Sequence, residues 1–319
     1  MEFEKSGKEF SGSEEKSRLV FKLHTEKDYQ VKALLEATGL PESTYYYWKA
    51  RFNREDPNKK TKEEIENILE TNKDYGYRRV KPKLEDAGIK IGEDKTRRLM
   101  KEMGCQCTTY SKKSGKYSSY KGEVGKIAPN RINRRFNTNV PHQKITTDTT
   151  EFKYYPVDSS GNARVEKLYM DPFLDMYNSE IITFRITKQP TGATIMAGLK
   201  EAIEKTADCE FRRTFHSDQG WAYQMNNYVD TLKKNSIFQS MSRKGNCLDN
   251  SPMENFFSLL KQEIYYGRIY RSYEELEAAI HTFIAYYNNH RIKEKLEYLS
   301  PVEYRLKEAA MKDLNLTAA

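Results

Sequence analysis

Apolar residues recur at helical spacing near the start of the chain. Val31, Leu34 and Leu35 fall on one face of a helix, and Gly39 follows as a stop signal. A second short element follows the turn. Two short helices joined by a tight turn resemble a helix-turn-helix, so residues 28–56 are predicted to form such a segment.

A second helical region is predicted over 57–104. Its first helix starts at Thr61, where Glu64 three residues on completes a capping box, and its last helix covers about 94–103. The basic residues of that last helix point mainly outward, as they do in a recognition helix that enters a DNA major groove. A basic surface helix that contacts nothing would show the same pattern.

From residue 143 the pattern changes to short runs of β-branched and aromatic residues. The predicted strands are 144–155, 164–174, 180–186, 211–217 and 237–240. Helices are predicted over 191–206, 223–234 and around Glu254. Three sequential strands followed by alternating helix and strand predict an α/β fold, a ribonuclease H-like mixed five-stranded sheet with flanking helices, preceded by small all-α helix-turn-helix-like DNA-binding units.

Two more capped helices close the chain. Ser272 stands three residues before Glu275, and Ser300 stands three residues before Glu303. Pro301 occupies the first turn of the last helix, where its missing amide hydrogen costs nothing.

These patterns divide the chain into six parts. They are a disordered tail (1–27), a helix-turn-helix-like segment (28–56), a helical DNA-binding domain (57–104), a basic linker (105–141), a ribonuclease H-like catalytic core (142–268) and a C-terminal helical extension (269–319). The tail is assigned from its Glu, Lys, Ser and Gly content, which cannot offset the entropy of ordering by itself.

Charge is distributed unevenly along the 319 residues. The net charge is +8, and residues 57–141 carry 21 Lys and Arg against 11 Asp and Glu, so the whole excess lies there. A basic block beside a nearly neutral domain suits an enzyme that holds a polyphosphate while its carboxylates stay available for metal. A solvated lysine-rich surface would give the same numbers.

The basic linker interleaves eight Lys and Arg with Tyr110, Tyr117 and Tyr120, and Glu123 is its only acid. Such a segment can follow a phosphate backbone while its rings stack on bases, although solubility alone would also explain it.

The four cysteines form no paired C-x-x-C sets, and we interpret them as reduced thiols. No apolar run approaches the length of a membrane span, and the N-terminus lacks a signal-peptide core. These features predict a cytosolic protein that contacts DNA and no membrane.

Asp148 and Asp218 stand where a fold can bring carboxylates together. Asp148 lies within the first predicted strand, where aspartate is a poor strand former and a buried charge needs a compensating cation. An aspartate facing solvent on an edge strand would look the same. Asp218 ends the strand 211–217 and precedes Gln219-Gly220, so it either starts a turn or lies at a strand end, where sites in α/β sheets gather.

Glu254 lies near the start of a predicted helix. Ser251-Pro252-Met253-Glu254 is also a capping-box sequence, in which the glutamate accepts from the Ser251 amide. Lys261 follows two helical turns later and shares a face with Glu254. Three carboxylates suit a pair of hard divalent cations, and an ammonium beside them can hold the adjacent DNA phosphate.

The spacing of these residues resembles a family signature. Asp148, Asp218, the thirty-five-residue gap to Glu254 and Lys261 at the seventh following position look like the D, D(35)E and lysine signature of bacterial insertion-sequence transposases of the OrfB type, which have a retroviral-integrase-like catalytic core. The likeness covers roughly residues 40–305. Further stretches similar to family blocks are 43–46, 76–80, 216–220, 245–254, 287–291 and 299–301.

The resemblance implies a DDE transposase or integrase, a polynucleotidyl transferase that cleaves DNA at element ends and transfers the strand to a target. It implies two Mg²⁺ ions, replaceable by Mn²⁺, held by Asp148, Asp218 and Glu254. It also implies double-stranded DNA partners, namely terminal inverted repeats and target DNA, and a homo-oligomer on that DNA. Members often act as a longer fusion, so an upstream-frame (OrfA-like) partner is a further expectation.

Other residues are assigned supporting roles. Candidate DNA contacts are Lys261, Arg78, Arg79, Arg97 and Arg98, and candidate pocket-shaping residues are His216, Asn246 and Asn250. For the three pocket-shaping residues, ordinary loop or strand roles explain the sequence equally well.

Two other functions fit the same acids. A ribonuclease H-like nuclease or resolvase would cut DNA without joining it, and a noncatalytic regulator would bind the element ends yet stay inert with magnesium.

Overall fold

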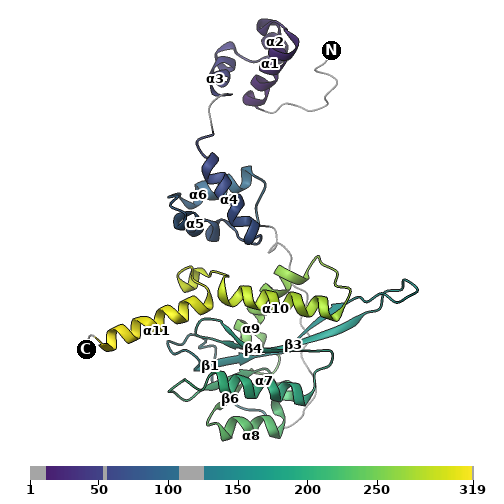
Figure 1. Cartoon of the computed structure of the whole chain (residues 1–319), viewed down its shortest axis with the longest axis vertical. Helices are drawn as coiled ribbons and strands as arrows, with labels where there is room; N and C mark the ends of the chain where they lie inside the picture. Colours follow the sequence, from purple (N-terminus) through teal and green to yellow (C-terminus); the bar gives the residue numbers. More distant parts are fainter. Residues whose placement is uncertain (1–11, 53–55, 108–125, 318–319) are drawn as a thin grey trace. The chain divides into compact units, whose positions relative to one another are not determined.

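The computed structural model describes residues 12–52, 56–107 and 126–317 (Figure 1). The chain divides into two compact units, 1–67 and 68–319. The predicted six-part division of the chain stays a prediction.

The first unit contains helices α1 (Ser13–Lys27), α2 (Val31–Thr38) and α3 (Glu42–Phe52). Gly39 ends α2 with a φ of 61°, a left-handed conformation that glycine adopts without strain, so the predicted stop signal is confirmed.

Helix α1 corrects the predicted disordered tail for residues 13–27. The polar composition of this helix gave no indication that Ser17 and Val20 face inward, where both are completely buried. Val20 packs in a single apolar cluster with Leu34, Leu35, Leu40 and Tyr45. Burial against α2 and α3 offsets the cost of ordering a helix that its own sequence does not favour. Residues 1–11 of the predicted tail lie outside the described residues.

The next three helices are α4 (Lys59–Thr71), α5 (Tyr77–Asp86) and α6 (Glu93–Glu102), and the unit boundary falls within α4. The predicted capping box from Thr61 is wrong, because α4 already begins at Lys59. The preceding turn forms when the Asp56 carboxylate accepts a hydrogen bond from the Asn58 amide at 2.8 Å.

The sheet lies in the second unit. Its strands are β1 (Lys144–Thr147), β2 (Thr150–Tyr154), β3 (Glu166–Asp175), β4 (Ile181–Thr187), β5 (Thr214–Ser217) and β6 (Phe238–Met241). β1 and β2 both pair antiparallel with β3 in one continuous register, Thr147 opposite Phe173 and Thr150 opposite Met170. The six strands therefore occupy five rows, and the first predicted strand is interrupted at Asp148.

The row formed by β1 and β2 is internal, since β1 pairs with β3 on one side and parallel with β5 on the other. β4 lies outside β3, and β6 pairs parallel with β5. Three antiparallel rows followed by two parallel ones give the predicted ribonuclease H-like mixed sheet.

Helices cover both faces of this sheet (Figure 1). α7 (Gly192–Lys205) and α8 (Asn226–Lys234) pack on one face, in a cluster that includes Phe173, Phe215 and Leu199. α9 (Ser251–Leu260) and α10 (Tyr273–Asn289) pack on the other, in a cluster that includes Leu174 and Ile280. Phe173 and Leu174 are neighbours on β3 and pack into clusters on opposite faces of the sheet, because successive side chains of a strand point to opposite faces.

The predicted caps near the C-terminus are confirmed. The Ser272 hydroxyl accepts from the Glu275 amide at 3.0 Å and begins α10. At the start of α11 (Pro301–Thr317) the box is reciprocal, because the Ser300 amide donates to the Glu303 carboxylate and the Glu303 amide donates to the Ser300 hydroxyl. Over the described ranges, none of the helices is both long and apolar enough to span a bilayer.

The predicted basic linker is not a free connection over residues 128–134. This segment packs along β6, where the Arg131 amide donates to Ser240 Oγ at 2.9 Å and the Ala128 amide donates to Met241 Sδ. The Arg134 guanidinium pairs with Asp249 at 3.0 Å. Several of its polar groups are thus bound within the chain. Residues 108–125 of the predicted linker lie outside the described residues.

Candidate active site

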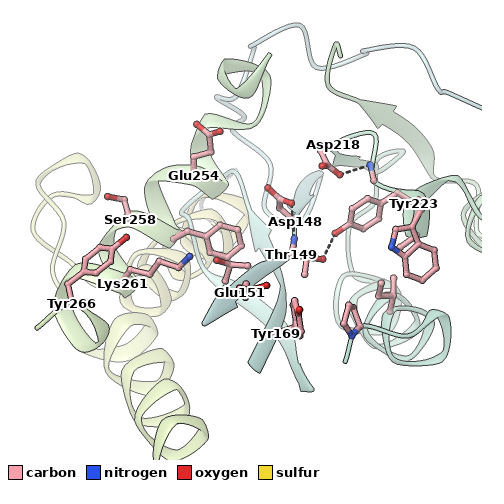
Figure 2. A pocket seen from close by; sticks show the side chains of 17 residues that line it. Asp148, Thr149, Glu151, Tyr169, Asp218, Tyr223, Glu254, Ser258, Lys261 and Tyr266 are labelled. Atoms are coloured by element: carbon pink, nitrogen blue, oxygen red, sulfur yellow. Dashed lines mark hydrogen bonds between the residues drawn. The ribbon is translucent and has the colours of Figure 1, made fainter. Parts of the chain in front are cut away.

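One pocket contains the three carboxylates and the lysine of the sequence signature. Asp148, Asp218, Glu254 and Lys261 all line a cavity of about 670 Å³ (Figure 2). They come from the break between β1 and β2, the end of β5, the first turn of α9 and the residue after α9. We call this cavity the carboxylate pocket.

Asp148 occupies the interruption of the internal row. Its Oδ1 accepts a hydrogen bond from the Thr149 amide at 2.8 Å, and this local bond replaces strand pairing. Burial raises the pKa of Asp148 well above its usual value, with further increases from the negative charges of Asp218 and Glu254. The alternative of a solvent-facing aspartate on an edge strand is therefore wrong.

Asp218 follows the last residue of β5 and serves the turn as well as the pocket. Its Oδ1 accepts from the Gly220 amide at 2.8 Å, so the turn interpretation of the sequence is correct too. A Cβ atom at Gly220 would lie only 2.9 Å from that same oxygen, which explains the glycine. Burial raises the pKa of Asp218 despite the hydrogen bond from Gly220.

Ser251 is not the N-cap that the alternative capping box requires. The N-cap of α9 is Asn250, so Ser251 is already helical, and the Ser251 hydroxyl donates to the Leu248 carbonyl at 3.2 Å. The Glu254 side chain lines the carboxylate pocket from the first turn of the helix (Figure 2).

Asn250 connects the helix of Glu254 to the strand of Asp148. Its side chain accepts from the Thr146 hydroxyl at 2.5 Å and donates to the Thr147 carbonyl at 3.3 Å. Because Asn250 immediately precedes α9, these bonds fix where the helix begins relative to β1.

The other two predicted pocket-shaping residues lie behind the cavity. His216 is fully buried in β5 between Ser240 Oγ at 2.8 Å and Ser242 Oγ at 3.1 Å, and burial lowers its pKa to about 4. Asn246 accepts from Arg134 at 3.2 Å in the loop before α9. Neither residue lines the carboxylate pocket.

Lys261 begins a short π-helical turn, Lys261–Tyr265, directly after α9. Its ammonium lies over the Phe152 ring, 5.2 Å from the centroid. Burial lowers the pKa of Lys261, while Glu151 and Asp148 act in the opposite direction. A partly desolvated cation near two acids is suited to bind an anionic group that enters the pocket.

The donor set fits a divalent cation in its chemistry. Asp148 and Asp218 are half-buried and their negative charges repel each other, and hard cations prefer such anionic oxygens. No group of three or more His, Cys, Asp or Glu side chains among the described residues is arranged as a ready metal cluster. Glu254 lines the same cavity, and a shift of its side chain toward the pair would complete a set of three carboxylates.

Sequence reasoning missed several residues of this site. Glu151 and Tyr223 line the pocket, and Asp171 lies buried behind it. The Thr149 hydroxyl donates to Asp171 and lies 3.5 Å from the Tyr223 hydroxyl. An aspartate inside the apolar strand β3 was the available signal, since Asp171 breaks that run much as Asp148 breaks its own.

Asp171 provides a test of the electrostatics. It is 2% exposed, its Oδ2 has no hydrogen-bond partner, and burial raises its pKa to about 6. A carboxyl whose folded pKa lies above its unfolded value of about 3.9 stabilises at low pH, and this stability is lost as pH rises through about 6.

We therefore expect Asp171→Asn to stabilise the protein more at high pH than at low pH. The gain relative to the unmodified chain should grow by about 1–2 kcal/mol between about pH 5 and about pH 8, measured by chemical denaturation without divalent ions. Asp230→Asn, on the surface of α8, is the matched control and should show no such difference. A constant gain across pH would contradict a raised Asp171 pKa.

The predicted arginine contacts lie away from the carboxylate pocket. Arg78 and Arg79 line a separate cavity of about 510 Å³ with Glu294 and Tyr298. Arg97 and Arg98 are exposed on α6, as predicted for a recognition helix.

Comparison with known proteins identifies the family. The integrase core domain family matches residues 138–247 and 254–308, and an HTH-like domain matches 55–113. InsK of Escherichia coli (strain K12), assigned as the transposase of insertion sequence element IS150, is 39% identical over 87% of this chain and 94% of its own length. An uncharacterized transposase-like protein of Haemophilus influenzae is 45% identical over 68% of this chain and 94% of its own.

Among solved structures, the catalytic core domain of BIV integrase aligns with a TM-score of 0.38 and 14% identity, covering 54% of this chain and 98% of that one. A pre-cleavage Mos1 transpososome aligns with a TM-score of 0.37 and 14% identity, covering 87% and 91%. The chain belongs to the insertion-sequence transposases with an integrase core domain, as the sequence signature predicted.

Proposed function

We propose that this transposase cleaves DNA at the ends of its element and joins the freed strand to target DNA by metal-dependent phosphoryl transfer. The observation that carries the proposal is the half-buried pair Asp148 and Asp218, which share one pocket with Glu254 and Lys261. Such a set is suited to phosphodiester chemistry because it combines metal-binding oxygens with a phosphate-binding cation.

Asp148, Asp218 and Glu254 would hold two Mg²⁺ ions, with Mn²⁺ able to replace them. When bound, the ions activate the attacking oxygen and neutralise the charge on the leaving oxygen of the phosphodiester. The mutual repulsion of Asp148 and Asp218 favours cation uptake, because a bound cation offsets the energetic cost of two neighbouring, partly desolvated negative charges.

Lys261 would bind a phosphate next to the scissile bond. The Lys261 ammonium is held over Phe152 and interacts with the charge of Asp148. A phosphate bound near Asp148 would therefore contact this ammonium. The Tyr223 hydroxyl stays protonated, since burial and three nearby aspartates raise its pKa, and it can donate to Thr149 beside Asp148. These two side chains would position substrate and carboxylate without forming a covalent bond to DNA.

The proposed substrates are the terminal inverted repeats of the element and a target duplex. Arg97 and Arg98, exposed on α6, would contact the repeats, with Arg78 and Arg79 as further contacts. Two ends and a target must meet, so the active form would be a homo-oligomer on DNA, with an upstream-frame (OrfA-like) chain as a possible further subunit.

A labelled-end assay tests the function. We expect purified chain, magnesium and a duplex carrying the element end to give both nicked product and a longer product in which the labelled 3′ end is joined to target DNA. Nicking without joining would favour the nuclease or resolvase alternative. DNA binding with neither product, in magnesium and in manganese, would favour the noncatalytic regulator.

A further inference from the structure

A second cavity lies at the β6 edge of the sheet, away from the carboxylates. Its volume is about 400 Å³, and it is enclosed by residues 126–131, α8, β6 and Arg212. Its floor is apolar, and its four charged lining residues are all cations: Lys126, Arg131, Arg212 and Lys233. We call this cavity the basic pocket.

Two of these cations are held at one aromatic ring. The Arg131 guanidinium carbon lies 4.3 Å from the Phe238 centroid, and the Arg212 guanidinium carbon lies 3.6 Å from the same centroid. Arg212 Nε also donates to the Ser236 carbonyl at 3.1 Å, and the Arg131 amide is fixed to Ser240. Both guanidinium groups are thus held in place at the edge of the cavity, where each can donate to a phosphate oxygen.

The four cations are not neutralised within the described part of the chain. None of them forms an ion pair with a described residue, although many other Lys and Arg side chains do so. No carboxylate lines the cavity. All four side chains are exposed, so an incoming polyanion meets them directly.

The basic pocket shares a wall with the carboxylate pocket. Gln239, which lines the basic pocket, donates from Nε2 to the backbone carbonyl of Tyr223 at 2.7 Å, and Tyr223 lines the carboxylate pocket. This bond joins β6, at the basic pocket, to the segment Trp221–Gln224, beside the carboxylate pocket. A duplex with one strand at the carboxylates can follow this wall to the cations.

We propose that the basic pocket binds the phosphate backbone of the DNA whose strand occupies the carboxylate pocket. The inference rests on the proposed function, since it takes DNA as the substrate. Paired guanidinium groups suit phosphate oxygens because each group donates in a planar fork.

The salt dependence of DNA binding tests this site. The full chain and its Arg131→Gln/Arg212→Gln variant are titrated with a short duplex over a series of salt concentrations, without divalent ions. Each phosphate that the variant no longer neutralises should lower the slope of log K against log salt by about 0.9, so we expect a decrease of about 1 to 2. The control Arg164→Gln/Lys200→Gln removes two exposed charges elsewhere and should keep the original slope.

A measurement on the unmodified chain removes any dependence on how the variant folds. Phenylglyoxal modifies accessible arginines, and mass spectrometry should show that the duplex protects Arg131 and Arg212 from it. An unchanged slope in the variant together with full modification in the presence of DNA would overturn the proposal. Protection by a polyglutamate peptide but not by the duplex would overturn it too, in favour of an acidic protein partner.

These results are separate from those for the proposed function. Binding is measured without divalent ions. A chain that binds DNA but fails to join strands would therefore refute strand transfer. The salt slope would still show whether the basic pocket binds the phosphate backbone.

Discussion

Glu254→Gln is expected to abolish magnesium-dependent nicking and strand transfer, with a fall of about 10³-fold or more. The amide keeps the size of the side chain but removes an anionic oxygen from the proposed ligand set. A reduction of about 4 kcal/mol in transition-state stabilisation corresponds to this factor. The labelled-end assay measures the fall, and calorimetry with DNA present should show reduced magnesium uptake. Duplex affinity without metal should change little, because Glu254 neutralises no phosphate.

The matched control is Glu151→Gln. Glu151 lines the same pocket, but its carboxylate pairs with Lys167 at 2.9 Å, and it lies outside the proposed ligand set. We expect this variant to keep most strand transfer. Substantial strand transfer by Glu254→Gln would refute the metal assignment. An equal reduction in both variants would show that the pocket tolerates no charge change and that Glu254 has no special role.

The order of the elements could be predicted because strand and helix periods differ clearly in the second half of the chain. The patterns around Leu168 and Ile181 predict strands, and both residues are buried in the sheet. Errors arose where long-range packing decides the outcome. The pattern around Val20 could not indicate that α1 is stabilised by packing against α2 and α3. Nothing in the local sequence around Arg134 predicts its ion pair with Asp249.

The carboxylate pocket could be predicted in outline for a different reason. Asp148 and Asp218 each stand out locally, one as a break in a strand and one at a strand end, and the family spacing adds Glu254. The register between distant strands could not be predicted. It places Asp171 on β3 close to Thr149, and so brings a further buried carboxyl behind Asp148.

The π-helical turn could not be predicted either, since the sequence places Lys261 two regular helical turns after Glu254. In the structure Lys261 lines the pocket, whereas Glu263 is buried and does not line it. Single π turns inside helices often occur at functional sites, because they change the direction of side chains over a few residues. A buried ion pair holds this turn, and its removal is the second prediction of large effect.

Arg291→Met is expected to destabilise the protein by about 3–5 kcal/mol, because it leaves the Glu263 carboxylate buried without its partner. The two side chains are 1% and 4% exposed and bond at 2.7 Å and 3.0 Å. Chemical denaturation measures the decrease in stability. The double variant Arg291→Met/Glu263→Met should recover most of the stability, since apolar groups of similar size can replace a buried pair. If the turn positions Lys261, the double variant should still bind DNA more weakly than the unmodified chain in low salt. Full recovery of stability and of DNA affinity would show that the pair contributes to folding alone.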